Sequence, residues 1–196
     1  MELHYLTKRI RNEILTAVLY CATRVLCSDE DDEKLDRILS YLYDTRGRVL
    51  ALRIGPLIEV RVYVDASSGA YCDMKSVTGV VIQIGKATVY VKSSKQKIVT
   101  KSSTEAELIR VSDALSQVLW TRELLIHHGI SIGPAVVYQD NQSTIFLANR
   151  GKSTSERTRH VKIRHFFINH YIEEKKISIL TGIMWDENTS KLWKNT

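Results

Sequence analysis

Three short acidic stretches decide the fold of this chain: VYVDAS at residues 62–67, KSSTEAEL at residues 101–108 and VVYQDNQS at residues 136–143. Asp65 and Asp140 each close an apolar, β-branched run, whereas Glu107 opens an apolar stretch with helical spacing. Carboxylates at the ends of neighbouring elements can converge, and magnesium ions prefer such hard oxygen ligands. The pattern therefore predicts a magnesium site, and the first hypothesis is a metal-dependent nuclease.

The spacing of apolar residues around these stretches predicts strands and helices in a definite order. The segment 59–67 alternates as a strand does, and residues 77–94 contain two β-branched runs joined by a turn at Gly85 and Lys86. A long helix follows and ends at Gly129. Four further elements are expected, namely a strand at 135–139, helices within 141–150 and 157–176, and a strand at 177–180. From residue 58 the predicted order is β-β-β-α-β-α-α-β, an α/β fold with a mixed sheet.

The segment before this core has the period of helices. Apolar residues recur at helical spacing over residues 8–26 and again over 29–47. The acidic run Asp29–Glu33 suits the positive end of the second helix better than a metal site. A further strand is predicted in ALRIG, residues 51–55.

Composition limits the class of protein. With 196 residues, 44% of them hydrophobic and 26% charged, the chain can bury one sizeable core. It contains no apolar run long enough for a membrane span and no signal peptide, so we expect an intracellular protein, cytoplasmic or nuclear. The three cysteines show no C-x-x-C spacing, which argues against a zinc knuckle or a disulfide framework. The net charge of +6 is concentrated after residue 60, as expected for a polyanionic substrate, although a basic protein can also simply be more soluble.

Four motifs stand out along the chain: SSKQKIVTKSSTEAEL, VLWTRELL, VVYQDNQSTIFL and RTRHVKIRHFFI. Together they resemble the ribonuclease H region of copia-type retrotransposon Pol polyproteins. The first 48 residues are similar to the segment just upstream of that region. The resemblance therefore implies a helical reverse transcriptase thumb or connection remnant over 1–48 and a ribonuclease H-like domain over 58–196. It also suggests a truncated copy without the polymerase palm, and so without polymerase activity.

The resemblance implies a role for individual acidic residues. Asp65, Glu107 and Asp140 match the first three catalytic carboxylates, which would bind two Mg²⁺ ions, with Mn²⁺ as a substitute. Asp186 is the nearest match to a fourth ligand, with Glu187 as a rival, because the tail TGIMWDENTSKLWKNT departs from the family ending. The implied substrate is the RNA strand of an RNA–DNA hybrid, and the implied partner is the rest of a Pol polyprotein.

Each carboxylate also has a structural interpretation. Asp65 could be an ordinary strand-end turn residue, and Asp140 could cap the helix that starts near Gln142. Glu107 fits a capping box with Thr104, while Ser102 and Glu105 fit another. The resemblance favours Glu107 over Glu105 as the ligand.

Two basic stretches are candidates for binding the hybrid. The first comprises Lys92, Lys95, Lys97 and Lys101, with Ser93, Ser94, Ser102 and Ser103 as hydrogen-bond donors to phosphate; a solvated loop is the alternative. The second is denser and comprises Arg157, Arg159, His160, Lys162, Arg164 and His165. Among these, the resemblance places Arg159 and His160 near substrate, together with Asn141, whereas His165 is expected to pack against the sheet.

The divergent tail keeps a second function open, a catalytically inactive remnant that binds nucleic acid through its basic face. An integrase-type domain is disfavoured, because Glu107 precedes Asp140 in the chain whereas an integrase would carry its glutamate late, on a C-terminal helix.

Overall fold

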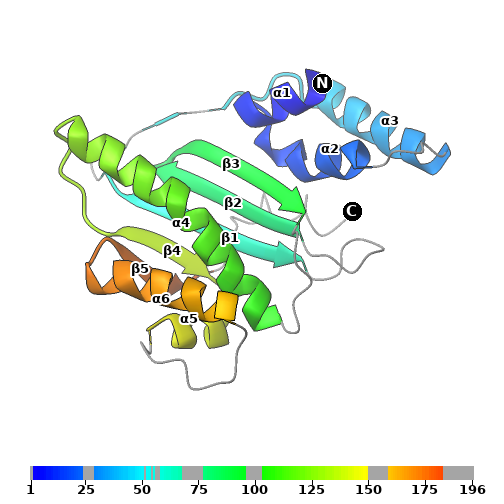
Figure 1. Ribbon diagram of the computed structural model, residues 1–196. Coiled ribbons are helices and arrows are strands. Elements are labelled where there is room, and N and C mark those ends of the chain that lie inside the picture. The colour runs from blue at the N-terminus through cyan, green and yellow to red at the C-terminus, as the bar shows by residue number, and fades with distance from the viewer. Residues whose placement is uncertain are drawn as a thin grey trace.

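A mixed five-stranded sheet forms the centre of the protein (Figure 1). The computed structural model describes residues 2–23, 29–50, 52–53, 55, 58–67, 77–95, 103–149 and 159–182. The strands are β1 (Val60–Ser67), β2 (Val77–Ile84), β3 (Ala87–Lys95), β4 (Ala135–Gln139) and β5 (Ile177–Thr181). Their order across the sheet is β3-β2-β1-β4-β5.

The direction of the strands divides the sheet into two parts. β1, β2 and β3 are antiparallel, and the β2–β3 hairpin turns at Gly85, whose φ of 61° suits glycine. β4 is parallel to both β1 and β5. The carboxyl ends of β1, β4 and β5 therefore meet at one edge of the sheet. This arrangement confirms the predicted order β-β-β-α-β-α-α-β.

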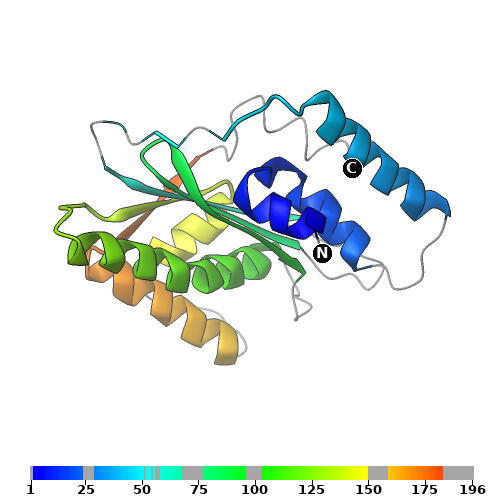
Figure 2. The same ribbon diagram turned by 90° about the horizontal axis from the view of Figure 1, so that it is seen from above.

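Three helices follow the hairpin: α4 (Ser103–His127), α5 (Gln142–Asn149) and α6 (Arg159–Glu173). Figure 2 shows α4 and α6 side by side along the sheet. Alternate strand residues and the apolar stripe of α4 form the main core, with Val62, Ile82, Leu115 and Ile168 all fully buried. As predicted, α4 ends before Gly129, which adopts a φ of 77°.

Polar contacts fix α6 against its neighbours. Arg164 donates to the carbonyl of Ile109 at 3.2 Å and forms an ion pair with Asp113, both on α4. His165 is buried as expected, and its Nε2 lies 2.7 Å from the carbonyl oxygen of Leu147 on α5. Because carbonyls only accept, this hydrogen bond requires the proton on Nε2.

The N-terminal segment folds into α1 (Glu2–Arg9), the short 3-10 helix η1 (Asn12–Ile14), α2 (Leu15–Ala22) and α3 (Asp29–Asp44). These helices have a small core of their own around Ile14, Val18 and Ile38. α2 touches the sheet where the hydroxyls of Thr16 and Ser93 lie 3.5 Å apart. The acidic run opens α3 as predicted, and among the described residues no helix combines the length and apolarity needed to cross a membrane.

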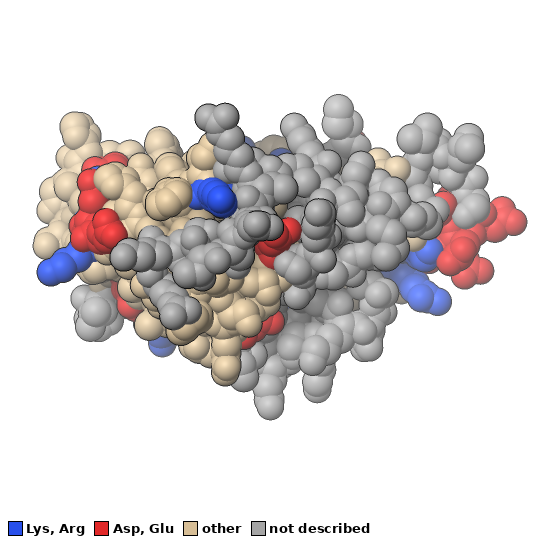
Figure 3. Space-filling model, turned by 60° about the horizontal axis from the view of Figure 1, so that its bottom comes forward, with Lys and Arg blue, Asp and Glu red and all other residues tan. Residues whose placement is uncertain are grey.

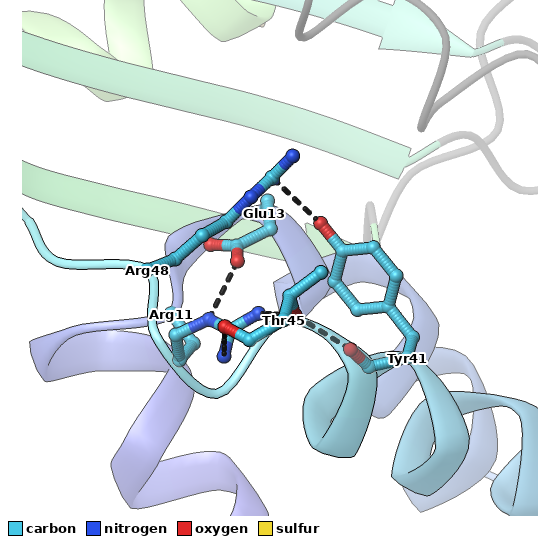
Figure 4. A network of polar contacts seen from close by, with 5 residues as sticks. All are labelled: Arg11, Glu13, Tyr41, Thr45 and Arg48. Atoms are coloured by element: carbon cyan, nitrogen blue, oxygen red, sulfur yellow. Dashed lines mark hydrogen bonds and ion pairs between the residues drawn. The ribbon is translucent and has the colours of Figure 1, made fainter.

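The prediction of one continuous helix from the spacing over 8–26 is wrong, because α1 ends at Arg9 and α2 begins at Leu15. Arg11 is buried and its Nε donates to Glu13 at 2.6 Å, while its Nη1 donates to the carbonyl of Thr45 at 3.3 Å (Figure 4). Burying this guanidinium against the end of α3 requires a bend that apolar spacing does not reveal. Likewise, the described residues of 51–55 lie outside strands.

Candidate functional site

The candidate site lies at the carboxyl ends of β1 and β4. The last paired residues of these parallel strands are Tyr63 and Tyr138, whose rings stack with centroids 5.1 Å apart. Asp65 and Asp140 each follow two residues later, so they are equivalent relative to this pair, with Asp140 directly after the end of β4. β1 continues to Ser67, and Asp65 therefore lies within the strand and not in a turn after it.

Glu107 reaches the same place from α4. It lies in the second turn and is only 6% exposed. The side chain of Gln139, the last residue of β4, donates from Nε2 to Glu107 Oε2 at 2.8 Å and to Asp140 Oδ1 at 3.2 Å. One amide group thus holds two of the predicted carboxylates together, with Glu107 buried and Asp140 exposed to solvent.

A buried cation completes this arrangement. Arg110 is fully buried, and its Nη1 donates to Glu107 Oε1 at 3.2 Å. The two carboxylate oxygens of Glu107 therefore face different donors, an arginine and an amide. Such pairing is what allows a carboxylate to remain ionised inside a protein.

The structure decides two of the helix-capping interpretations of the acidic residues. The side chain of Asn141, and not that of Asp140, accepts the backbone N–H of Thr144 at 3.2 Å and so caps α5. Thr104 lies inside α4, which rules out its capping box with Glu107. Thr144 Oγ1 lies 3.5 Å from the carbonyl of Thr104, so the first turns of α4 and α5 adjoin each other.

The chain passes this site again after β5. The N–H of Gly182 donates to the carbonyl of Gln139 at 3.2 Å. A Cβ on Gly182 would lie 2.4 Å from Cδ1 of Tyr138, so only glycine fits without displacement of the ring. Asp186 and Glu187 lie outside the described residues, four and five positions further on.

Several predicted residues are described through their backbone alone. Asp65 belongs to β1, Ser103 to α4, and Arg159 and His160 to the start of α6, and the side chains of these four residues lie outside the described part of the structure. Ser102 lies outside the described part of the chain. No cluster of three metal-binding side chains occurs among the described residues, which include only two of the predicted ligands completely.

Among the described residues, basic side chains do not gather on the face seen in Figure 3. Its described lysines and arginines are scattered, and acidic groups lie between them. Lys97, Lys101 and Arg157 of the two predicted basic stretches fall outside the described residues. Arg164 is held by Asp113, which makes it a structural residue of the α4–α6 contact.

The donor chemistry of the site fits a magnesium ion. Glu107 and Asp140 offer only oxygen atoms, the ligands that Mg²⁺ prefers. Gln139 Oε1 is buried without a hydrogen-bond partner among the described residues, and it could accept a hydrogen bond from a water on the ion.

Two residues of the site, Gln139 and Arg110, were missed by the sequence analysis. Gln139 ends an otherwise apolar run directly before Asp140, and a polar residue there signals a buried hydrogen bond. Arg110 follows Glu107 by three positions, the spacing of side chains that meet on a helix.

The fold is that of a known class. A ribonuclease H1, LC11, isolated from compost superimposes with a TM-score of 0.50 at 16% identity, over 70% of this chain and 92% of that one. The foamy viral protease-reverse transcriptase in complex with an RNA/DNA hybrid superimposes with a TM-score of 0.52 at 15% identity, over 94% of this chain and 24% of that one. The protein therefore has the ribonuclease H fold.

Sequence relatives identify the family of this chain. It is 30% identical over 169 residues to the retrovirus-related Pol polyprotein from transposon RE1 of Arabidopsis thaliana, and 29% identical over 161 residues to that from transposon TNT 1-94 of Nicotiana tabacum. These alignments cover 85% and 82% of this chain, and the chain spans 12% of each polyprotein. No protein-family model matches. The chain corresponds to the ribonuclease H region of a retrovirus-related Pol polyprotein.

Proposed function

We propose that this chain is the ribonuclease H of a copia-type element and hydrolyses the RNA strand of RNA–DNA hybrids with two metal ions. The observation that supports this most is the meeting of Glu107 and Asp140 at the amide of Gln139. It lies beside the strand position of Asp65, at the edge of the sheet where strands of this fold end.

The proposed ligands are Asp65, Glu107, Asp140 and Asp186, with Mg²⁺ as the physiological ion and Mn²⁺ as a substitute. Bound Mg²⁺ supplies an activated water as nucleophile and stabilises the charge on the leaving 3′ oxygen. Glu107, positioned by the amide of Gln139, would provide a buried inner ligand. Asp140, which is exposed, would present its carboxylate on the substrate side.

Binding of the hybrid is proposed to involve the start of two helices. The adjoining first turns of α4 and α5 direct the positive ends of two helix dipoles toward this edge, which favours nearby phosphates. Ser102, Ser103, Asn141, Arg159 and His160 are the proposed substrate contacts. Discrimination of RNA from DNA would depend on the 2′-hydroxyls in the minor groove.

A second candidate is a catalytically inactive protein that binds nucleic acid. The ion pair of Arg110 with Glu107 favours it, because a permanent cation already contacts a proposed metal ligand.

Cleavage of a labelled RNA–DNA hybrid in Mg²⁺ tests the proposal. The Asp140→Asn variant should cleave at least about 100-fold more slowly, since it loses a ligand and not merely an outer-shell contact. Asp36→Asn on α3 is the matched control, because Asp36 is exposed and belongs to the N-terminal helices. Negligible cleavage by both the wild type and Asp140→Asn, with binding of the hybrid retained, would refute the enzyme and support the second candidate.

A further inference from the structure

Arg110 is unusual in its burial. Its side chain is 0% exposed, and that of its partner Glu107 is 8% exposed. A guanidinium cannot lose its proton at any physiological pH, so a full positive charge remains in the interior. Removing such a charge from water is unfavourable unless acids surround it.

The position of the charge matters for the carboxylate site. Arg110 Nη1 approaches Glu107 Oε1 at 3.2 Å, while Gln139 occupies Oε2 at 2.8 Å. Both oxygens of the proposed inner ligand are therefore engaged in the metal-free protein. A divalent ion that bound Oε1 would either share that oxygen with the guanidinium or displace it, and in both cases the buried positive charge would repel the ion.

We propose that Arg110 is an internal counter-ion of Glu107 that competes with divalent metal ions for this carboxylate. This inference rests on the proposed function, since it concerns the same metal site. It has two consequences: the fold does not need metal to neutralise the buried Glu107, and the affinity of the site for divalent ions is set by the strength of this ion pair.

Binding of Mn²⁺ to the full chain, measured by electron paramagnetic resonance of the free ion, tests the inference. Arg110→Met keeps the length of the side chain and removes its charge. It should bind Mn²⁺ at least about tenfold more tightly than the wild type, because the buried positive charge beside Glu107 no longer repels the ion. Its melting temperature should be lower than that of the wild type in EDTA, and excess Mn²⁺ should narrow this difference.

Arg122→Met is the matched control. Arg122 also lies on α4 and also contacts a glutamate, Glu123, at 3.2 Å, but it is remote from Glu107 in the helix. The Mn²⁺ affinity of the Arg122→Met protein should equal that of the wild type. Equal affinities of wild type and Arg110→Met would overturn the competition while leaving the metal site intact. No binding by any variant, Arg110→Met included, would overturn the proposed metal site and this inference together.

A measurement on the wild type covers the case in which Arg110→Met does not fold. The ¹⁵N signals of the Arg110 guanidinium should change at the Mg²⁺ concentrations that fill the site, as followed by nuclear magnetic resonance. Filling of the site without any change in these signals would contradict the competition.

Discussion

Replacing Gln139 by glutamate would exchange a donor for a third negative charge at the site. The amide of Gln139 now donates to Glu107 at 2.8 Å and to Asp140 at 3.2 Å. At an effective dielectric constant of about 20, a carboxylate this close to another is repelled by about 5 kcal/mol. The protein can avoid this repulsion by keeping the new carboxyl protonated. Retaining a proton at about pH 8 on a group whose ordinary pKa is about 4.3 also costs about 5 kcal/mol.

We therefore expect Gln139→Glu to be less stable than the wild type by about 3–5 kcal/mol at about pH 8 in EDTA. Because the fold raises the pKa of the new carboxyl, the folded state binds its proton more tightly, and the loss should shrink as the pH falls toward about 5. Added Mg²⁺ should also reduce this loss of stability. Urea unfolding followed by circular dichroism gives the free energy of unfolding under each condition.

Gln83→Glu is the control for this substitution. Gln83 lies in β2, and its amide donates to the hydroxyl of Thr88 at 3.2 Å, so a carboxylate there meets no like charge in that contact. Its free energy of unfolding should change by about 1 kcal/mol or less. A Gln139→Glu protein as stable as the wild type at about pH 8 in EDTA would refute the argument that this amide joins two ionised carboxylates.

Two further predictions concern stability. Asn141→Ala should lower the free energy of unfolding by about 1 kcal/mol through loss of the α5 cap, whereas Asn141→Ser should retain most of it; equal losses in urea titrations would contradict the cap. Burial raises the pKa values of Tyr63 and Tyr90, so their contribution to stability is complete below about pH 10 and is lost as the pH rises further. Melting temperatures should therefore fall above that pH, less steeply for Tyr63→Phe and Tyr90→Phe, and identical slopes would count against this cause.

Much of the fold could be predicted because its elements have clear periodic patterns. The face of α4 that carries Leu108, Val111, Leu115 and Val118 is buried as its spacing indicates. The hairpin turn at Gly85 and the end of α4 before Gly129 were predicted because positive φ angles favour glycine. These features are determined by residues close together in the sequence, so they can be predicted from one sequence.

The features that could not be predicted depend on contacts between distant segments. The bend after α1 arises because Arg11 reaches Thr45, 34 positions away. Similarly, Gln139 reaches Glu107 across 32 positions. Apolar spacing contains no information about which polar side chain will be buried against which, so the two predicted acids Glu107 and Asp140 were correctly grouped but their shared donor was not found.

The close approach of Gly182 to Tyr138 fixes where the chain leaves β5, because a single methyl group on Gly182 would meet the tyrosine ring. Gly182 also donates to the carbonyl of Gln139, the residue before Asp140, so the last described residue of the chain lies beside the carboxylate site. Four residues of fully extended chain span about 14 Å, so Asp186 can lie no farther than that from Gly182. Gly182→Ala would consequently disturb the contact with Tyr138 while leaving every acidic group unchanged, so it separates the effect of this exit point on the site from the chemistry of the carboxylates.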